Sequence, residues 1–434
     1  MKPTAPLRAR LAALSPYGIW GLVALGLLLA PRLFTQSFAL SLLSQMGIMV
    51  IFALSYNILF GQTGLLSFGH SVYLGLGAFF CVQVLNAVAA GSSIWPVSLL
   101  PLVGGGAGAF FALVFGAVLT RKAGTPFAMI TLGIGEMVFA AALMFPGFFG
   151  GEAGIVGDRT AGGNFLGVAG WNFGPPIQVY YLIAAWCFVS TAAMFALTRT
   201  PLGRVANAVR DNPERAEFIG FNPGFVRWIM VVMAGFFAGV AGALTAINFE
   251  IASAENLSAL RSGSVLLATV IGGSAFFFGP VLGAVVFVFF AVALSEFTPA
   301  WQLYLGLFFV LLVMFAPGGL ASLLQGAARL ARGGKLRWLV GPLLGLVAAY
   351  LLLALGVVLV VEMAYQATLA LGANPVARIA GAEFDPSRPG NWALAAILIA
   401  AGTAAVARGG RRFAERRDSV GNQAVRLQQP GEQS

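Results

Sequence analysis

The chain has 434 residues, of which 59% are hydrophobic and 9% charged, and its mean hydropathy is +0.89. Soluble globular proteins contain about 45–50% apolar and about 25% charged residues, so this composition excludes a soluble globular protein and indicates one that lies mainly in lipid. The formal net charge of +10 would suggest a nucleic-acid partner for a soluble protein. Here the basic residues lie in connections between apolar runs, so no nucleic-acid partner is expected.

The apolar runs predict an all-α polytopic integral membrane protein, because a bilayer span needs about 20 mainly apolar residues. The first run follows Lys2, Arg8 and Arg10 and resembles a signal peptide. No small-residue cleavage pattern follows Ala30, so we interpret it as a retained first span. The expected spans are 17–34, 38–60, 71–90, 97–119, 126–148, 179–197, 228–248, 263–278, 280–297, 301–316, 338–361 and 391–407.

About ten of these spans form an expected core, residues 1–335, and two more belong to a C-terminal extension, residues 336–434. The boundary is expected near Gly333–Gly334. The run 263–278 is short and rich in glycine, and the sequence leaves open whether it crosses the membrane or re-enters on the same side. The polar tail after Arg408 has the composition of a disordered segment.

Basic residues set the expected orientation, because cytoplasmic loops of membrane proteins carry an excess of Lys and Arg. With the N-terminus inside and every span crossing, 20 of the 25 basic residues fall on the cytoplasmic side. Both termini are therefore expected in the cytoplasm. The basic residues left outside are Arg32, Arg159, Arg261, Arg378 and Arg388.

Signatures of catalysis and of cofactor binding are missing from the sequence. There is one histidine, no cluster of Cys and His with metal-ligand spacing and no GxxxxGK[ST] phosphate loop. No cofactor or metal is expected in this chain, and an ATPase that drives it would have to be another chain. Cys81 and Cys187 lie in apolar runs and are interpreted as reduced core residues.

The segment 61–70 interrupts an apolar run with glycines and hydrogen-bonding side chains, among them Gln62, Ser67 and His70. Backbone that leaves a helix at membrane depth is tolerated only where protein or a water-filled cavity satisfies it. The segment is therefore a candidate part of a solute path, and a tight turn packed between helices is the alternative. His70 is interpreted as a structural hydrogen-bonding residue rather than a titrating switch.

A second glycine-rich break, at Gly272 and Gly273, lies in the other half of the chain. Paired interruptions in two halves are typical of transporters, whose solute sites form where such broken helices meet. We therefore expect 61–70 and 272–283 to meet near the midplane and to border the path. Glu136 lies within span 126–148 and is expected to face the bundle interior with a polar partner, because a carboxylate in lipid is costly. It could line the path or sit near the boundary.

The cytoplasmic stretch 203–220 predicts two short helices. Asn212 is a good N-cap, Pro213 suits the first helical position, and Gly220 ends the second helix. Apolar residues at helical spacing outside any span indicate a docking element rather than a solvated loop. The candidate residues are Gly203, Arg204, Ala208, Arg210, Asn212, Pro213, Ala216, Glu217 and Gly220.

Four ordered motifs, over roughly residues 15–335, resemble the LivM-type permeases of ABC importers for branched-chain amino acids. The motifs are Gly61–Ala78, Gly203–Gly220 followed by Ala238–Leu244, Ile271–Ala284, and Pro317–Leu320. The 203–220 stretch is similar to the loop through which such permeases contact their ATPase. The extension after about residue 335 is not part of the usual pattern.

The resemblance implies a permease subunit of the inner (plasma) membrane that works by alternating access. Its implied partners are a second, LivH-like permease, two cytoplasmic ATPase subunits that bind ATP, and a periplasmic or extracellular substrate-binding protein. A urea or short-amide importer is the nearest alternative, because urea permeases share these motifs. A stand-alone secondary carrier is the alternative of a different class, and the scarcity of ionisable groups within the spans disfavours it.

Overall fold

A computed structural model describes residues 16–34, 36–93, 95–161, 171–332, 336–369, 377–379 and 382–428. Helices make up most of these residues, and strands only a few, which confirms the expected all-α architecture. The chain forms two compact units. The first contains Met1–Phe297 and Leu305–Ala321, and the second contains Thr298–Tyr304 and Ser322–Ser434. The expected boundary near Gly333–Gly334 lies outside the described residues.

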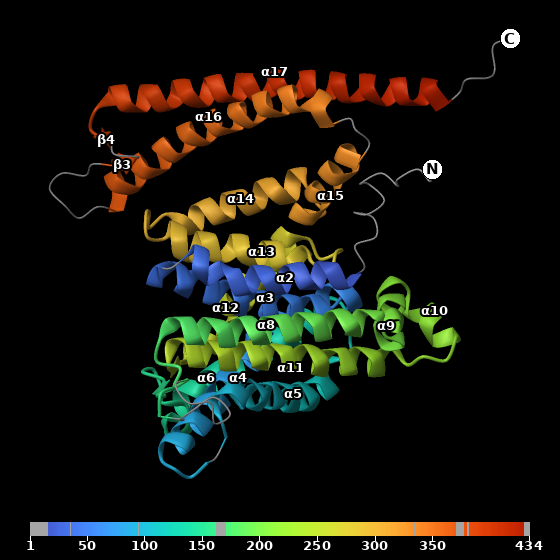
Figure 1. Ribbon diagram of the computed structural model, residues 1–434, viewed down its shortest axis with the longest axis vertical. Coiled ribbons are helices and arrows are strands. Elements are labelled where there is room, and N and C mark those ends of the chain that lie inside the picture. The colour runs from blue at the N-terminus through green and yellow to red at the C-terminus, as the bar shows by residue number, and fades with distance from the viewer. Residues whose placement is uncertain are drawn as a thin grey trace, which may run out of the picture. The chain divides into compact units, whose positions relative to one another are not determined.

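The helices of the first unit run side by side, and two short ones project at one end (Figure 1). In chain order its elements are α2 (Pro16–Leu33), α3 (Ser37–Thr63), α4 (Ser71–Ala89), a 3₁₀ turn (Val97–Leu99), α5 (Leu100–Leu119), α6 (Thr125–Met144), α7 (Pro146–Phe149), β1 (Ile155–Val156), α8 (Pro176–Arg199), α9 (Pro201–Asp211), α10 (Pro213–Phe218), α11 (Pro223–Phe249), β2 (Ile251–Ala252), a 3₁₀ turn (Ala254–Leu257), α12 (Ala259–Gly272), α13 (Gly279–Val288) and a π-helical turn (Phe289–Leu294).

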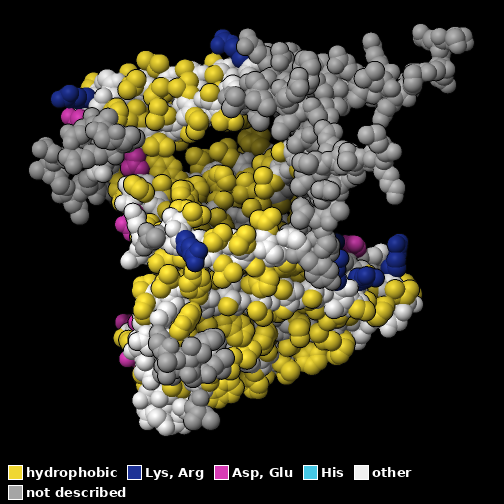
Figure 2. Space-filling view, viewed as in Figure 1, with side chains coloured by type: hydrophobic (Ala, Val, Ile, Leu, Met, Phe, Trp, Pro, Cys, Tyr) yellow, Lys and Arg dark blue, Asp and Glu magenta, His cyan; other side chains and the backbone are white. Residues whose placement is uncertain are grey.

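Every expected span corresponds to an apolar helix among the described residues. Eight helices are long and apolar enough to cross a membrane, and a bent pair, Trp301–Phe315 with Gly319–Ala328, makes a possible ninth. Three shorter apolar helices are Trp20–Leu33, Ala259–Gly272 and Gly279–Leu294. Figure 2 shows apolar side chains over the flanks of the first unit, with Lys and Arg grouped near α9 and α10. The apolar helices thus agree with the predicted spans, and the orientation of the termini stays a prediction.

Three helices, α4, α5 and α11, pack closely through glycines. A Cβ on Gly239 of α11 would meet the carbonyl of Gly104 on α5, and a Cβ on Gly242 would meet the carbonyl of Leu74 on α4. In lipid, where burial of apolar surface drives helix association little, such backbone approach supplies the packing energy. These helices therefore form a close-packed part of the first unit.

The second unit is a helical hairpin. It contains α16 (Leu336–Leu369), β3 (Ala377–Ile379), β4 (Ala382–Phe384) and α17 (Pro389–Gln428). Leu359 and Met363 of α16 pack against Ala395 of α17. Glu362 accepts hydrogen bonds from the hydroxyls of Thr298, at 2.6 Å, and Tyr304, at 2.9 Å. Two donors therefore satisfy this carboxylate on an apolar helix. Helices α14 (Trp301–Phe315) and α15 (Gly319–Arg332) contribute residues to both units.

The predicted disorder of the tail after Arg408 is wrong as far as Gln428, because α17 continues to that residue. The segment is rich in Arg, which is a strong helix former, so its polarity ends the span without ending the helix. Residues 429–434 lie outside the described residues.

We predict that Gly242→Val destabilises the first unit, because the new side chain would collide with backbone on α4. Overpacking of this kind costs typically about 1–3 kcal/mol. Thermal unfolding in detergent measures the change. Gly106→Val is the matched control, since a Cβ there on α5 meets nothing within 4 Å. Equal unfolding midpoints for the two variants would contradict the packing described for α4, α5 and α11.

Candidate functional site

The first break begins where α3 ends. Gly64 has a left-handed backbone, φ +70°, and Leu65 donates its N–H to the carbonyl of Leu59 at 3.1 Å. The chain then returns along the last turns of α3, where the Tyr56 hydroxyl donates to the carbonyl of Ser67 at 3.1 Å. The Phe68 N–H donates to the Thr131 hydroxyl of α6 at 3.1 Å. The protein thus satisfies several polar groups of this non-helical backbone, as membrane depth requires.

His70 closes this returning segment in the core. Its Nε2 lies 3.0 Å from the Ser55 hydroxyl of α3, and its ring stacks on Phe52 with centroids 5.5 Å apart. Tyr56 and Tyr73 meet the same ring edge-on. His70 is fully buried. This packed, hydrogen-bonded position is the one that its interpretation as a structural residue expects.

Three buried polar atoms near the end of α3 have no hydrogen-bond partner among the described residues. They are the side-chain oxygens of Asn57 and Gln62 and the Nδ1 of His70. Buried polar groups are normally paired, so these three atoms have hydrogen-bonding capacity that a polar ligand or water can satisfy. Gln62 and Ser67, both expected to border a solute path, are buried here.

The two glycine breaks lie against each other. A Cβ on Gly61 would come within 2.7 Å of the carbonyl of Ser274, which follows Gly273 in the turn between α12 and α13. Gly273 has φ +101° and Gly272 packs on the carbonyl of Gly279, so both positions need glycine. Arg210 of α9 contacts the same end of α3. The contact therefore lies at the α9 end of the first unit, and its expected depth near the midplane stays a prediction.

A second junction joins the start of α4 to the start of α12. The Ser71 hydroxyl donates to the carbonyls of Leu257 and Ser258, each at 2.9 Å, and its N–H donates to the Ser262 hydroxyl at 3.0 Å. Helix α12 has 14 residues and spans about 21 Å, less than a hydrocarbon core of about 30 Å. The chain thus reaches α12 through a 3₁₀ turn rather than a regular α-helix. The serine junction provides hydrogen bonds for the backbone carbonyls of this turn.

The 203–220 stretch forms the two expected short helices, α9 and α10. The Asn212 side chain accepts a hydrogen bond from the Arg215 N–H at 2.9 Å, so Asn212 is the N-cap of α10. Gly220 has φ +90° and follows the end of α10. The Thr200 side chain caps α9, which begins at Pro201, slightly before the expected start. The local structure of this segment was therefore predictable from its caps.

Arg210 connects α9 to the first glycine break. Its Nη1 donates to the carbonyl of Gly61 in the last turn of α3, and its aliphatic stem lies against Gly64. Asp211 holds the guanidinium from the other side at 2.9 Å. Carbonyls of a last helical turn lack partners within the helix, so the guanidinium replaces a missing donor. The sequence predicted functional roles for 61–70 and 203–220, but it did not predict the contact between Arg210 and Gly61.

The apolar residues of this loop divide between an inner and an outer face. Val209 and Ala216 are buried within the chain, so neither side chain is available to a partner. Ala208 is exposed. At the end of α10, Phe218 is 90% exposed and Ile219 is 66% exposed. The exposed apolar surface thus lies beyond the residues that helical spacing indicated.

Glu136 is exposed on α6. The expectation that it faces the interior of this chain's own bundle is therefore wrong. Phe127, Thr131 and Val138 provide the buried face of α6, and Glu136 falls on the opposite face with Met137. The hydrophobic run concealed this orientation, because both faces of α6 are apolar.

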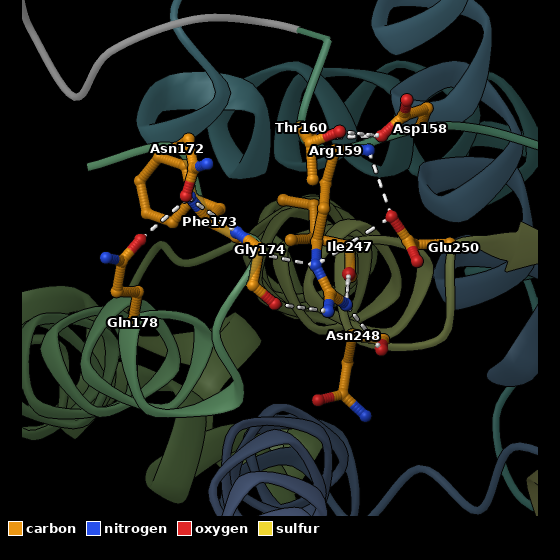
Figure 3. A network of polar contacts seen from close by, with 10 residues as sticks. All are labelled: Asp158, Arg159, Thr160, Asn172, Phe173, Gly174, Gln178, Ile247, Asn248 and Glu250. Carbon is orange, nitrogen blue, oxygen red and sulfur yellow. Dashed lines mark hydrogen bonds and ion pairs between the residues drawn. The ribbon is translucent and has the colours of Figure 1, made fainter. Parts of the chain in front are cut away.

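Arg159 forms a polar network on the side expected to face outward (Figure 3). Its guanidinium donates to the carbonyls of Phe173 at 2.7 Å and of Ile247 and Asn248 at 3.0 Å each. Glu250 lies 3.8 Å away as an ion-pair partner. The arginine thus caps the end of α11 and ties the loop before α8 to it. From the sequence, Arg159 was predicted only as a basic residue on the outer side of the membrane.

The same network holds two unusual backbone conformations. Phe173 and Glu250 are the non-glycine residues with positive φ in the described chain, at 57° and 58°. Such conformations persist where surrounding contacts determine them. Beside them, hydrogen bonds from the Thr160 hydroxyl and N–H lower the pKa of the Asp158 carboxyl below its ordinary value. This part of the loop is therefore an ordered structure.

Comparisons with known proteins give consistent results. The family model described as the permease component of the branched-chain amino acid transport system matches residues 38–317. The high-affinity branched-chain amino acid transport system permease protein LivM of Escherichia coli is 28% identical over 304 residues, 66% of this chain and 70% of the relative. LivM of Salmonella typhimurium is 29% identical over 308 residues, with the same two shares. The fructose import permease protein FrcC of Rhizobium meliloti is 24% identical over 311 residues, 68% of this chain and 82% of the relative. No solved structure matches the chain.

We predict that Arg159→Ala opens the outward loop and the end of α11. The variant loses several charge-assisted hydrogen bonds, each worth about 1.5–3 kcal/mol. Hydrogen exchange of the amides around 247–250 should become roughly tenfold faster or more. Glu152→Gln, an exposed change in the same loop, is the control and should leave exchange unaltered. Wild-type protection in Arg159→Ala would contradict the role assigned to the network.

Proposed function

This chain belongs to the family of permease components of branched-chain amino acid transport systems, and on that premise we propose that it carries branched-chain amino acids inward across the membrane. It is a multi-pass permease subunit of an ABC importer. Its sequence has no phosphate loop of its own. In the proposed assembly, two cytoplasmic ATPase subunits supply the energy, and a separate binding protein delivers the solute from outside.

The observation that carries this proposal is the exposed apolar end of α10. Large apolar side chains that protrude from a charged loop are a liability unless a partner buries them. Phe218 and Ile219 protrude in this way, on the side that the basic residues assign to the cytoplasm. We assign this surface, Phe218, Ile219 and Phe221, to contact with an ATPase subunit, and call it the docking surface.

The contact of Arg210 with Gly61 gives the docking surface a route into the bundle. Helix α9 lies between α10 and the end of α3, and α3 meets the turn after α12 at Ser274. A displacement of α9 by the ATPase would therefore act on both glycine breaks at once. In an alternating-access cycle these breaks are the places where the chain can bend without the loss of regular helical hydrogen bonds.

A second permease subunit accounts for the position of Glu136. A carboxylate that faced lipid near the middle of a span would cost about 2.5–3.5 kcal/mol on insertion scales. Glu136 is exposed in this chain, so we assign the exposed face of α6, with Met129, Gly133 and Met137, to contact with the LivH-like partner or to the path between the two subunits.

The proposed substrate class follows the two relatives named for branched-chain amino acids. The fructose permease shows that similar chains serve other solutes, and urea or a short amide is the alternative that the sequence motifs leave. Uptake of radiolabelled leucine, fructose and urea by the assembled importer distinguishes the three. The proposed location is the inner membrane, with both termini in the cytoplasm.

We predict that Phe218→Asp combined with Ile219→Asp prevents association with the ATPase. A charge at a buried interface costs several kcal/mol when it has no partner. Copurification of the ATPase subunits and ATP-dependent uptake of leucine should both fall at least tenfold. Membrane insertion should be normal, because both residues are exposed.

Phe297→Asp is the matched control, because Phe297 is 86% exposed and lies on the side expected to face outward. Its copurification with the ATPase should equal that of the wild type. If the Phe218→Asp, Ile219→Asp variant still binds the ATPase, the docking surface does not contact that subunit. The proposed function would then lose its main physical support.

A further inference from the structure

A small cavity lies among α3, the end of α11, the start of α12 and the π-helical turn that follows α13. Its volume is about 90 Å³. That volume exceeds the about 10–15 Å³ that admits one water, and the cavity is open on one side. It can therefore take the charged end of a small ligand whose remainder lies at the mouth.

Arg261 supplies the positive charge of this cavity. Its Nε is shut off from solvent and has no hydrogen-bond partner, and its guanidinium donates to no protein atom within the described residues. An arginine inside a membrane protein normally pairs with a carboxylate or with backbone carbonyls. The unpaired guanidinium therefore indicates an anionic group supplied by a ligand, and a carboxylate fits its fork of donors best.

Two hydrogen-bond acceptors line the same cavity. The Gln45 amide nitrogen donates to the Ser41 hydroxyl at 3.2 Å, which leaves the Gln45 carbonyl oxygen as an acceptor. The Thr245 hydroxyl donates to the carbonyl of Ala241 at 2.8 Å, which leaves its oxygen lone pairs. Acceptors without a negative charge suit an ammonium group that remains close to its own carboxylate.

The remaining wall is apolar. Ile48 of α3, Phe249 of α11 and Val288 of α13 are among the residues that provide it. A site with a guanidinium, two neutral acceptors and an aliphatic wall is complementary to a zwitterionic amino acid with an aliphatic side chain. Urea and fructose have neither a carboxylate nor an aliphatic side chain. The π-helical turn at 289–294 contributes to the wall, and such turns often occur at functional sites.

We propose that this cavity binds the transported amino acid within the permease, with Arg261 on its α-carboxylate, Gln45 and Thr245 on its ammonium group and the apolar wall on its side chain. The inference rests on the proposed function and adds a site to it. It makes the permease itself selective for the solute, in addition to any selection by a binding protein.

The test measures binding of tritiated L-leucine to the purified importer, assembled with its permease partner and ATPase subunits but without a binding protein. Unlabelled leucine should displace the label, and leucinamide, which lacks the carboxylate, should not. Arg261→Gln should weaken leucine binding at least tenfold, and Arg261→Lys should restore part of it. Arg388→Gln, which removes an exposed arginine of the C-terminal extension, should bind as the wild type does.

Gln45→Leu decides the matter if Arg261→Gln does not assemble, since it keeps the volume and removes one acceptor; it should also weaken binding. If Arg261→Gln assembles and its leucine affinity lies within twofold of the wild type, the proposal is overturned. If Arg261→Gln does not assemble, the same result for Gln45→Leu overturns it. Displacement of the label by leucinamide also overturns it. Uptake separates this failure from that of the proposed function. If the wild-type importer takes up leucine and the variants bind leucine normally, only the proposed site is wrong. If the wild-type importer takes up no leucine, both the site and the proposed function are wrong.

Discussion

The structure depends on one constraint: backbone that leaves a helix inside a membrane must find its hydrogen bonds within the protein. At two of the places where the chain leaves a helix in the first unit, different side chains supply these hydrogen bonds. After α3, Tyr56, Ser55 and Thr131 receive the returning segment. Before α12, the hydroxyls of Ser71 and Ser262 do the same. Around these junctions, α4, α5 and α11 form a support so close-packed that glycine is needed at their contacts.

Polar contacts hold the broken spans at both ends of the first unit. On the side assigned to the cytoplasm, Arg210 joins α9 to the carbonyl of Gly61, next to the turn at Ser274. On the other side, Arg159 closes the end of α11, from which the chain descends to α12. The cavity at Arg261 lies between the same elements. Movement of the docking surface and binding in the cavity would thus act on the same two helices, α3 and α12.

Much of this could be read from the sequence, because the signals are local. Hydropathy located the apolar helices, and Asn212 and Gly220 marked the ends of α10. The orientation that the excess of arginines predicts stays a prediction. The misses involve contacts distant in sequence or helix faces that composition does not distinguish. Glu136 was assigned to the interior because a carboxylate in lipid is costly, and the apolar residues on both faces of α6 gave no sign of its exposed position. Arg159 and Arg261 were counted only as outside charges, since nothing near them in sequence shows that one caps α11 and the other borders a cavity. Helix α17 continued beyond its span because its polar residues favour helix.

The central claim is that the link from Arg210 to Gly61 carries the motion of the ATPase into the broken spans. The number of leucine molecules imported per ATP hydrolysed, measured with the reconstituted importer, tests it most directly. Arg210→Ala removes a charge-assisted hydrogen bond worth about 1.5–3 kcal/mol, so the account predicts that this ratio falls at least tenfold, whereas Arg215→Ala, an exposed change on α10, leaves it unchanged. A wild-type ratio in Arg210→Ala would contradict the account.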